Sequence, residues 1–306
     1  MATIVATFKP KGETQLKTKI LAGLLAGIGL ISFNCAAKDA TAPAAASQIK
    51  NQVLIELKIP DIKFPEGNKP LDCRQFRVRI LDVAAGKAVG IHSHENRAGA
   101  LSIAGGKGMT VYAYNYAPVT VPFGGSYKAY NDIVHYATNS SKTETLSIMT
   151  SDFLDDGKSC DGKTYPQHTP IADGLKVEKH PFFVNAPQTK EEDEVDHEYF
   201  RTQLRDVKLP DGKAALSERS LRIRRVTLDK GASVGVKDYA NRPSYIMNLN
   251  GIIDVKNVSA NTSKMLKAKE AANLINAGQV EIKNTDSDKA TYFVIELWDP
   301  SDRDIL

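Results

Sequence analysis

The chain repeats itself at a fixed distance of 145 residues, and this repeat limits the folds available to it. Residues 61–106 match residues 206–251 without a gap. Fourteen residues of the first copy are identical to the residue 145 positions later: Asp61, Lys63, Pro65, Gly67, Leu71, Arg74, Arg77, Arg79, Gly86, Val89, Gly90, Asn96, Arg97 and Gly106. Composition alone predicts about three matches in such a window. The sequence therefore predicts two copies of one domain.

Each copy is predicted to consist mainly of β-strands. Five segments alternate between apolar and polar residues or are rich in β-branched and aromatic residues: 76–83, 109–116, 146–150, 221–226 and 292–298. Gly86 and Gly231 follow two of them and predict turns. Only residues 263–277 have a helical composition. Many strands and few helices predict an all-β chain of two sandwiches or small barrels.

The N-terminal residues have the pattern of an export signal. Four lysines precede the uncharged stretch 20–33, and small residues follow at 35–37. This order of a basic, an apolar and a small-residue region is typical of signal peptides, and the apolar stretch is short for crossing about 30 Å of hydrocarbon. We expect export to the periplasm or out of the cell, without a stable membrane span in the mature chain. A short anchor, a buried helix and lipid attachment at Cys35 are the alternatives.

Charge and composition suggest how the rest of the chain is organised. The net charge is only +4, and no basic run is interleaved with aromatic residues, so the sequence does not indicate nucleic-acid binding. The acidic run 191–194 is interpreted as a solvated linker or first turn between the copies. The predicted parts are a signal peptide and leader, a flexible linker, a first domain and a second domain, covering residues 1–40, 41–51, 52–178 and 179–306.

The cysteines are consistent with export. Cys35 lies in the signal region, which leaves Cys73 and Cys160 as a pair in the mature chain. Both lie in polar sequence, where buried and inert cysteines are less expected. We expect a disulfide between them in an oxidising compartment, with two unrelated thiols as the alternative.

Three histidines are candidate metal ligands. His92 and His94 are two residues apart, so on a strand they lie on the same face and can share one metal ion. His135 is the third candidate, and Asn139 follows it by four residues. Ordinary surface histidines are the alternative interpretation.

Two groups of residues resemble the two motifs of the cupin family: Gly86, His92, His94 and Gly106, followed by Gly124, His135 and Asn139. The resemblance extends from residue 52 to the C-terminus and implies a bicupin, with two tandem jelly-roll barrels. It also implies that His92, His94 and His135 line the first barrel and bind one divalent metal ion. Iron, manganese, nickel and zinc all remain open.

The chain departs from the cupin pattern at the fourth ligand. Cupins commonly have a glutamate four or five residues after the second histidine, where this chain has Ala98 and Gly99. Glu95 is next to His94 and is expected on the opposite face unless a bulge turns it inward.

The second copy has lost all three histidines. Lys237, Tyr239 and Val280 stand at the positions of His92, His94 and His135. A protonated amine and a phenol do not replace imidazoles as ligands at neutral pH. We therefore expect the second barrel to be free of metal.

Other candidate binding residues are Arg97, Tyr112 and Tyr114. A guanidinium at Arg97 can hold a carboxylate in two parallel hydrogen bonds. The alternative is a structural arginine, and this is favoured because Arg242 keeps its place in the second copy, where the histidines are lost. Tyr112 and Tyr114 are candidates for the wall of the pocket.

Two classes of function follow. A divalent ion on three neutral histidines favours small anionic ligands and fits a metal-dependent dioxygenase, lyase or isomerase. A non-enzymatic protein that binds a small ligand or has a structural role is the alternative, supported by the missing glutamate and the decayed second site.

Overall fold

The computed structural model describes residues 48–62, 64, 69–94, 96–129, 133–165, 183, 186–187 and 193–302. The predicted signal peptide, Cys35 and Glu95 lie outside these residues. Within them, no helix has both the length and the apolar character needed to span a membrane.

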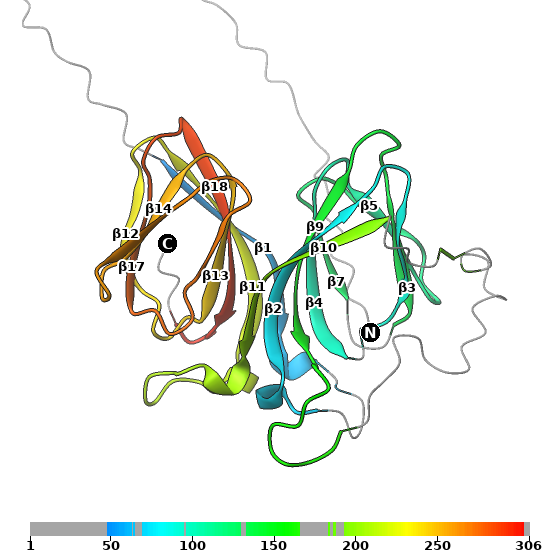
Figure 1. Cartoon of the computed structure of the whole chain (residues 1–306), viewed down its shortest axis with the longest axis horizontal. Coiled ribbons are helices and arrows are strands. Elements are labelled where there is room, and N and C mark those ends of the chain that lie inside the picture. Colours follow the sequence, from blue (N-terminus) through cyan, green and yellow to red (C-terminus); the bar gives the residue numbers. More distant parts are fainter. Residues whose placement is uncertain are drawn as a thin grey trace, which may run out of the picture. The chain divides into compact units, whose positions relative to one another are not determined.

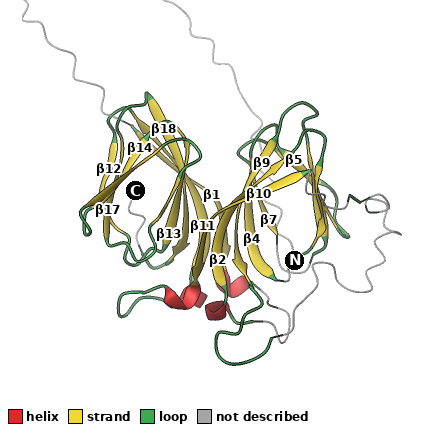
Figure 2. Cartoon of the chain, in the orientation of Figure 1, coloured by secondary structure: helices red, strands yellow, loops and turns green. Residues whose placement is uncertain are grey.

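Strands make up nearly all of the regular structure, so the prediction of an all-β chain is confirmed (Figure 2). The strands of the first half are β1 (Ile49–Lys58), β2 (Gln75–Val83), β3 (Ala88–His92), β4 (Arg97–Ala104), β5 (Met109–Ala113), β6 (Val119–Val121), β7 (Ser126–Ala129), β8 (His135–Asn139) and β9 (Leu146–Leu154). Those of the second half are β10 (Glu194–Gln203), β11 (Ser220–Asp229), β12 (Ser233–Asp238), β13 (Ser244–Asn250), β14 (Ile253–Asn257), β15 (Thr262–Leu266), β16 (Ala271–Asn273), β17 (Gln279–Asn284) and β18 (Lys289–Trp298). Short 3-10 turns occur at η1 (Ile59–Asp61), η2 (Leu71–Cys73), η4 (Leu204–Asp206) and η5 (Leu216–Glu218).

Four antiparallel sheets form two barrels of the same design. In barrel one, a sheet of order β10-β2-β9-β4-β7 faces a sheet of order β3-β8-β5-β6. In barrel two, the corresponding orders are β1-β11-β18-β13-β16 and β12-β17-β14-β15. Within each barrel most sequence neighbours lie in opposite sheets, apart from the hairpins β5-β6 and β14-β15, and this is the jelly-roll arrangement. The prediction of two tandem jelly-roll barrels is confirmed.

The two halves of the chain exchange their first strands. β1 belongs to the first half but pairs with β11 in barrel two, and β10 belongs to the second half but pairs with β2 in barrel one. In Figure 1, β1 lies beside β11 and β10 lies beside β2. The predicted boundary at residues 178 and 179 stays a prediction, but neither barrel is built from one half alone. The predicted linker 41–51 is wrong at its end, because residues 49–51 already belong to β1.

The alternation of β2 determines what lies inside barrel one. Phe76 and Val78 belong to an apolar cluster on the outer face of the sheet, together with residues of β1, β11 and β18. Leu81 and Val83 belong to the cluster inside the barrel. Alternate residues of a strand face opposite sides, so the interior positions before Leu81 are occupied by arginines. One end of the barrel interior is therefore apolar and the other end is cationic.

The helix predicted at residues 263–277 is wrong. β15 and β16 occupy this segment, separated by a turn in which Lys269 has a φ of 67°. Leu266 is fully buried, and β15 pairs with β14 while β16 pairs with β13. Helical composition is a weak preference, and burial with cross-strand pairing outweighs it.

The repeated asparagine has a structural role in both barrels. The Asn139 side-chain amide donates to the carbonyls of Val83 (3.1 Å) and Glu144 (2.8 Å). The Asn284 amide donates in the same way to Leu228 (3.1 Å) and Ser287 (2.8 Å). Asn139 therefore links the end of β8 to the end of β2, and Asn284 links the end of β17 to the end of β11 in the same way.

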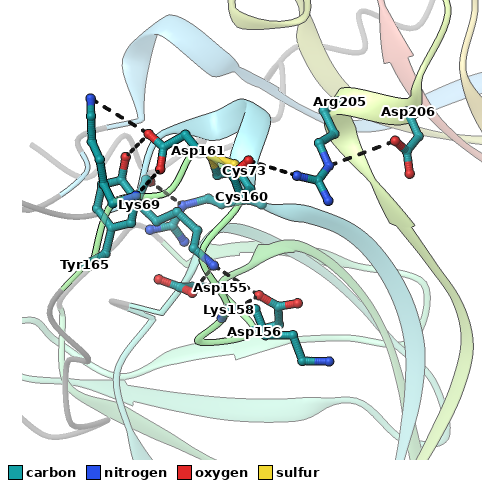
Figure 3. The surroundings of a disulfide bond; sticks show 12 residues. Lys69, Cys73, Asp155, Asp156, Lys158, Cys160, Asp161, Tyr165, Arg205 and Asp206 are labelled. Carbon is teal, nitrogen blue, oxygen red and sulfur yellow. Dashed lines mark hydrogen bonds and ion pairs between the residues drawn. A yellow bond between two sulfur atoms is a disulfide. The ribbon is translucent and has the colours of Figure 1, made fainter.

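Cys73 and Cys160 form a disulfide in the structure, with their Cα atoms 5.4 Å apart (Figure 3). It joins η2 to the loop that follows β9. Lys69 lies close by and pairs with Asp155 (2.9 Å) and Asp156 (3.0 Å). The disulfide and the ion pairs together hold this loop against the segment that precedes β2.

We expect the disulfide to contribute substantially to stability. Replacing both cysteines by serine should lower the free energy of unfolding by about 4 kcal/mol, because the bond closes a long loop in the unfolded chain and so limits its entropy. The cysteines are 87 residues apart. Urea denaturation of the two proteins measures the difference. Equal stabilities would contradict the prediction.

Candidate metal centre

His92, His94 and His135 come together at one end of barrel one. His92 ends β3, and its partner across the sheet is His135, the first residue of β8. His94 follows two residues after β3 and brings its Nε2 to 3.2 Å from Nε2 of His92. One ring nitrogen from each histidine lies within 4.8 Å of the other two. The structure therefore brings together the three predicted ligands.

Backbone carbonyls fix the orientation of two of the rings. Nδ1 of His92 lies 2.7 Å from the carbonyl of Gly90, and Nδ1 of His135 lies 2.8 Å from that of Ile133. A neutral ring that donates through Nδ1 keeps its lone pair on Nε2. Metal-binding histidines in proteins are commonly held in this way. The donor set therefore fits a divalent metal ion bound through Nε2 atoms.

Burial keeps the histidines neutral. It is the largest cause that lowers the pKa of His92 and His94 well below the ordinary value, and nearby positive charge adds to the effect. For His135, burial lowers the pKa to about 4, although the hydrogen bond to Ile133 opposes the shift. Neutral imidazoles have a lone pair to offer to a metal near neutral pH.

The metal-free protein should become less stable as the pH falls. An unfolded histidine has a pKa of about 6.5, so between that value and the folded pKa of about 4 for His135 the unfolded state binds more protons. The stability contributed by neutral His135 is complete above about pH 6.5. About 2 kcal/mol of it should be lost between pH 7 and pH 5.

Urea denaturation after metal chelation, at pH 7 and pH 5, measures this loss. His135→Gln is the matched variant, since it has no imidazole to titrate at that position. An equal pH dependence in both proteins would contradict the prediction.

The histidines line a small cavity with a volume of about 50 Å³. Apolar residues of the barrel form part of its wall: Leu81, Val89, Met109, Val111, Ala129, Ala137 and Ile148. Its polar residues besides the histidines are Arg79, Arg97, Ser102, Tyr127, Thr150 and Glu194. The cavity therefore combines possible metal ligands with two guanidinium groups and one carboxylate.

Glu194 reaches this cavity because the halves exchange strands. It is the first residue of β10 and pairs with Val83 of β2. Burial raises the pKa of its carboxyl group, although Arg79 and Arg97 oppose the shift. Its Oε2 atom is buried without a hydrogen-bond partner. The interpretation of residues 191–194 as solvated linker is wrong for Glu194.

Sequence reasoning missed Glu194 and Arg79. The signal that could have found Glu194 is the repeat, which aligns it with Ile49, the first residue of β1. That alignment marks a strand start, but it does not say which barrel receives the strand.

Arg97 lines the cavity, and whether it binds a ligand there stays a prediction. Burial is the largest cause that lowers the pKa of its guanidinium to about 10, and repulsion by Arg79 adds to it. Its Nε atom is buried without an acceptor. Its counterpart Arg242 instead lies 3.8 Å from a carboxylate oxygen of Glu296. The two arginines therefore have different surroundings despite the shared motif.

Tyr112 and Tyr114 do not line the cavity. Met109 and Val111 of β5 face the cavity, and Tyr112, the residue after Val111, therefore faces the opposite side of the strand. Tyr112 stacks on Tyr136, with ring centroids 4.7 Å apart. Tyr114 packs in the same aromatic cluster. The structure gives these two residues a packing role and does not support the prediction that they bind substrate.

Barrel two has other residues at the positions of the histidines. Lys237 pairs with Val280 across β12 and β17, as His92 pairs with His135. Tyr239 and Val280 are buried in an apolar cluster. The described residues of this barrel contain no cluster of possible metal ligands. That barrel two binds no metal stays a prediction.

Comparisons with known proteins give matches in structure only. No protein-family model and no curated protein sequence matches this chain. Similar solved structures include an oxalate decarboxylase from Lactobacillus farciminis, with 10% identity, a TM-score of 0.48, and coverage of 79% of this chain and 85% of that one. A Cupin 2 conserved barrel domain protein from Leptotrichia buccalis has 9% identity, a TM-score of 0.40, and coverage of 84% and 92%. The bacterial pirin YhhW from Escherichia coli, in complex with nickel(II), has 14% identity, a TM-score of 0.43, and coverage of 81% and 91%.

Proposed function

We propose that barrel one binds one divalent metal ion through His92, His94 and His135 and acts on a small anionic molecule beside it. The observation that carries this proposal is the convergence of three neutral imidazoles, those of His94 and His135 buried and that of His92 partly buried, with their ring nitrogens within 4.8 Å of one another. Three protein ligands leave coordination positions open, as in catalytic metal sites. A bound divalent ion can supply Lewis acidity or activate oxygen.

The other groups of the cavity suit a reaction. Glu194 can accept or donate a proton at Oε2, the oxygen that has no hydrogen-bond partner. Since burial raises the pKa of this carboxyl group, its proton affinity is closer to that needed near neutral pH. We therefore favour a metal-dependent dioxygenase, lyase or isomerase.

A binding protein without catalytic activity is the second candidate. It is favoured by barrel two, where Tyr239 and Val280 are buried in the apolar core, so one barrel of this protein already persists without the histidines.

An oxygen-consumption and product screen separates the two candidates. Protein supplied with iron, manganese, nickel or zinc is tested against small carboxylic acids, diketones and phenols. Turnover that is lost in His94→Ala but kept in Tyr239→Phe supports an enzyme. Saturable binding of a test compound without turnover supports the binding protein.

We also propose that the protein is exported, with residues 1–40 as signal peptide and leader. The disulfide between Cys73 and Cys160 supports this, because such bonds persist in oxidising compartments. N-terminal sequencing of the protein from cell fractions tests it. Met1 retained in a cytoplasmic fraction would overturn it.

A further inference from the structure

The two barrels contain the same set of three arginines, but different carboxylates balance the positive charges of the set in each barrel. Arg77 and Arg79 of β2 correspond to Arg222 and Arg224 of β11, and Arg97 corresponds to Arg242. In barrel two the strand opposite places Glu296 across from Arg222, and in barrel one it places Asp152 across from Arg77. Asp152 and Glu296 are thus equivalent in register, and they differ by one methylene group.

Glu296 interacts with all three arginines of barrel two. Its carboxylate accepts from Nε of Arg222 at 2.7 Å and from Nε and Nη2 of Arg224 at 2.7 and 3.1 Å. Nη1 of Arg242 lies 3.8 Å from Oε2. The Glu296 side chain is fully buried. Three arginines of barrel two therefore surround one carboxylate that the chain itself supplies.

The shorter Asp152 holds only one arginine of barrel one. It accepts from Nε and Nη2 of Arg77 at 3.0 and 2.7 Å. Arg79 pairs instead with Asp196 of the exchanged strand, at 2.5 Å. Among the residues that the structure describes, none makes a hydrogen bond or an ion pair within 4.0 Å to the guanidinium of Arg97. The Nε atoms of Arg79 and Arg97 are both buried without an acceptor.

These two arginines line the same cavity as the histidines. A buried guanidinium without an acceptor is costly, and such groups in proteins call for an explanation. Arg97 can donate two parallel hydrogen bonds to a carboxylate, an arrangement that an ammonium group does not reproduce. The cavity volume of about 50 Å³ accommodates a few non-hydrogen atoms, since one water needs about 10–15 Å³ by the same measure.

We propose that Arg97, assisted by Arg79, binds a carboxylate group of a small ligand in barrel one, at the place that Glu296 fills in barrel two. The proposal builds on the proposed function, because it names the chemical class of ligand held beside the histidines. Glu194 is the one carboxylate among the described residues lining the cavity. It lies near both arginines without pairing with either, so a bound carboxylate must share the cavity with it.

Acetate titration tests the proposal, with acetamide as the neutral probe of the same shape. We expect one acetate per chain in the wild type and much weaker binding of acetamide. Arg97→Gln should weaken acetate binding at least tenfold, and Arg97→Lys should give a smaller loss. Asp152→Glu should weaken it as much as Arg97→Gln, since the longer side chain supplies the carboxylate that Glu296 supplies in barrel two. Arg225→Gln is the matched control, because Arg225 is bound to Gln52 outside the cavity.

Zinc content is measured on the same preparations. It should be unchanged in the Arg97 and Asp152 variants. If zinc binds normally but acetate binding is unchanged in Arg97→Gln and Asp152→Glu, the proposed carboxylate site is wrong and the metal proposal stands. The reverse result, acetate bound through Arg97 with no zinc in the wild type, would overturn the metal proposal alone. Equal binding of acetate and acetamide, or no acetate binding by the wild type, also contradicts the carboxylate site.

Discussion

His94→Ala is expected to remove the metal from the protein. His94 is buried, and its Nε2 atom lies 3.2 Å from that of His92, so no other described side chain is placed to take over its role. Loss of groups that merely orient a ligand weakens metal binding by about 10–100-fold, so loss of a direct ligand should cost at least about 100-fold. The wild type should contain about one ion per chain, and the variant almost none, by elemental analysis after identical preparation.

Variants of barrel two provide the control for this experiment. Tyr239→Phe and Lys237→Ala change the residues at the positions of His94 and His92, and metal content should not change. Tyr239→Phe keeps the ring, which is needed because Tyr239 is only 2% exposed. A wild-type protein that stays free of metal after exposure to iron, manganese, nickel and zinc would contradict the metalloprotein proposal and favour the binding protein.

The jelly-roll barrels and the role of His135 were implied by the resemblance to cupins. The two similar all-β domains and the pair His92 and His94 were predictable from the sequence itself for a physical reason. Both depend on local regularities. The repeat is visible because each barrel needs the same turns and interior residues, and the pair His92 and His94 is visible because a strand has a period of two. The same period did not say which face of β5 is inside the barrel, so Tyr112 was named as a candidate for the wall of the pocket although Val111 is the neighbour that faces the cavity.

The acidic partner of the site was not predictable in this way. Glu194 is 100 positions after His94, and it enters the cavity only because β10 crosses into barrel one. An acidic run next to a predicted boundary is usually solvated, and no local feature distinguishes Glu194 from its neighbours. Exchange of strands between two similar barrels is decided by long-range pairing, which composition and periodicity do not reveal.

The relation between Asp152 and Glu296 was hidden for a different reason. The repeat offset of 145 aligns Glu296 with Ser151. The second copy is one residue shorter in this region, since Asn139 and Asp152 are 13 positions apart whereas Asn284 and Glu296 are 12 apart. Only the strand register shows that each carboxylate lies opposite the equivalent arginine. A single deletion in a loop therefore concealed the most informative difference between the barrels.

Glu296→Gln is expected to destabilise the protein severely. The substitution keeps the shape of the side chain but removes the negative charge that faces Arg222, Arg224 and Arg242. All three arginine side chains are at most 4% exposed, so water cannot replace the lost charge. Removing one member of a buried ion pair typically costs about 3–5 kcal/mol, because the remaining charge stays buried.

Glu198→Gln is the matched control, because the same chemical change is made at an exposed pair. Glu198 accepts from Arg201 in two hydrogen bonds and its Oε2 lies 4.0 Å from Nη1 of Arg77, but its side chain is 34% exposed, so its loss should cost less than about 1 kcal/mol. Urea denaturation at pH 7, followed by two spectroscopic probes, measures both variants against the wild type. Similar midpoints for Glu296→Gln and Glu198→Gln would mean that barrel two does not depend on its internal carboxylate. Barrel two would then give no reason to expect a bound carboxylate at the equivalent place in barrel one.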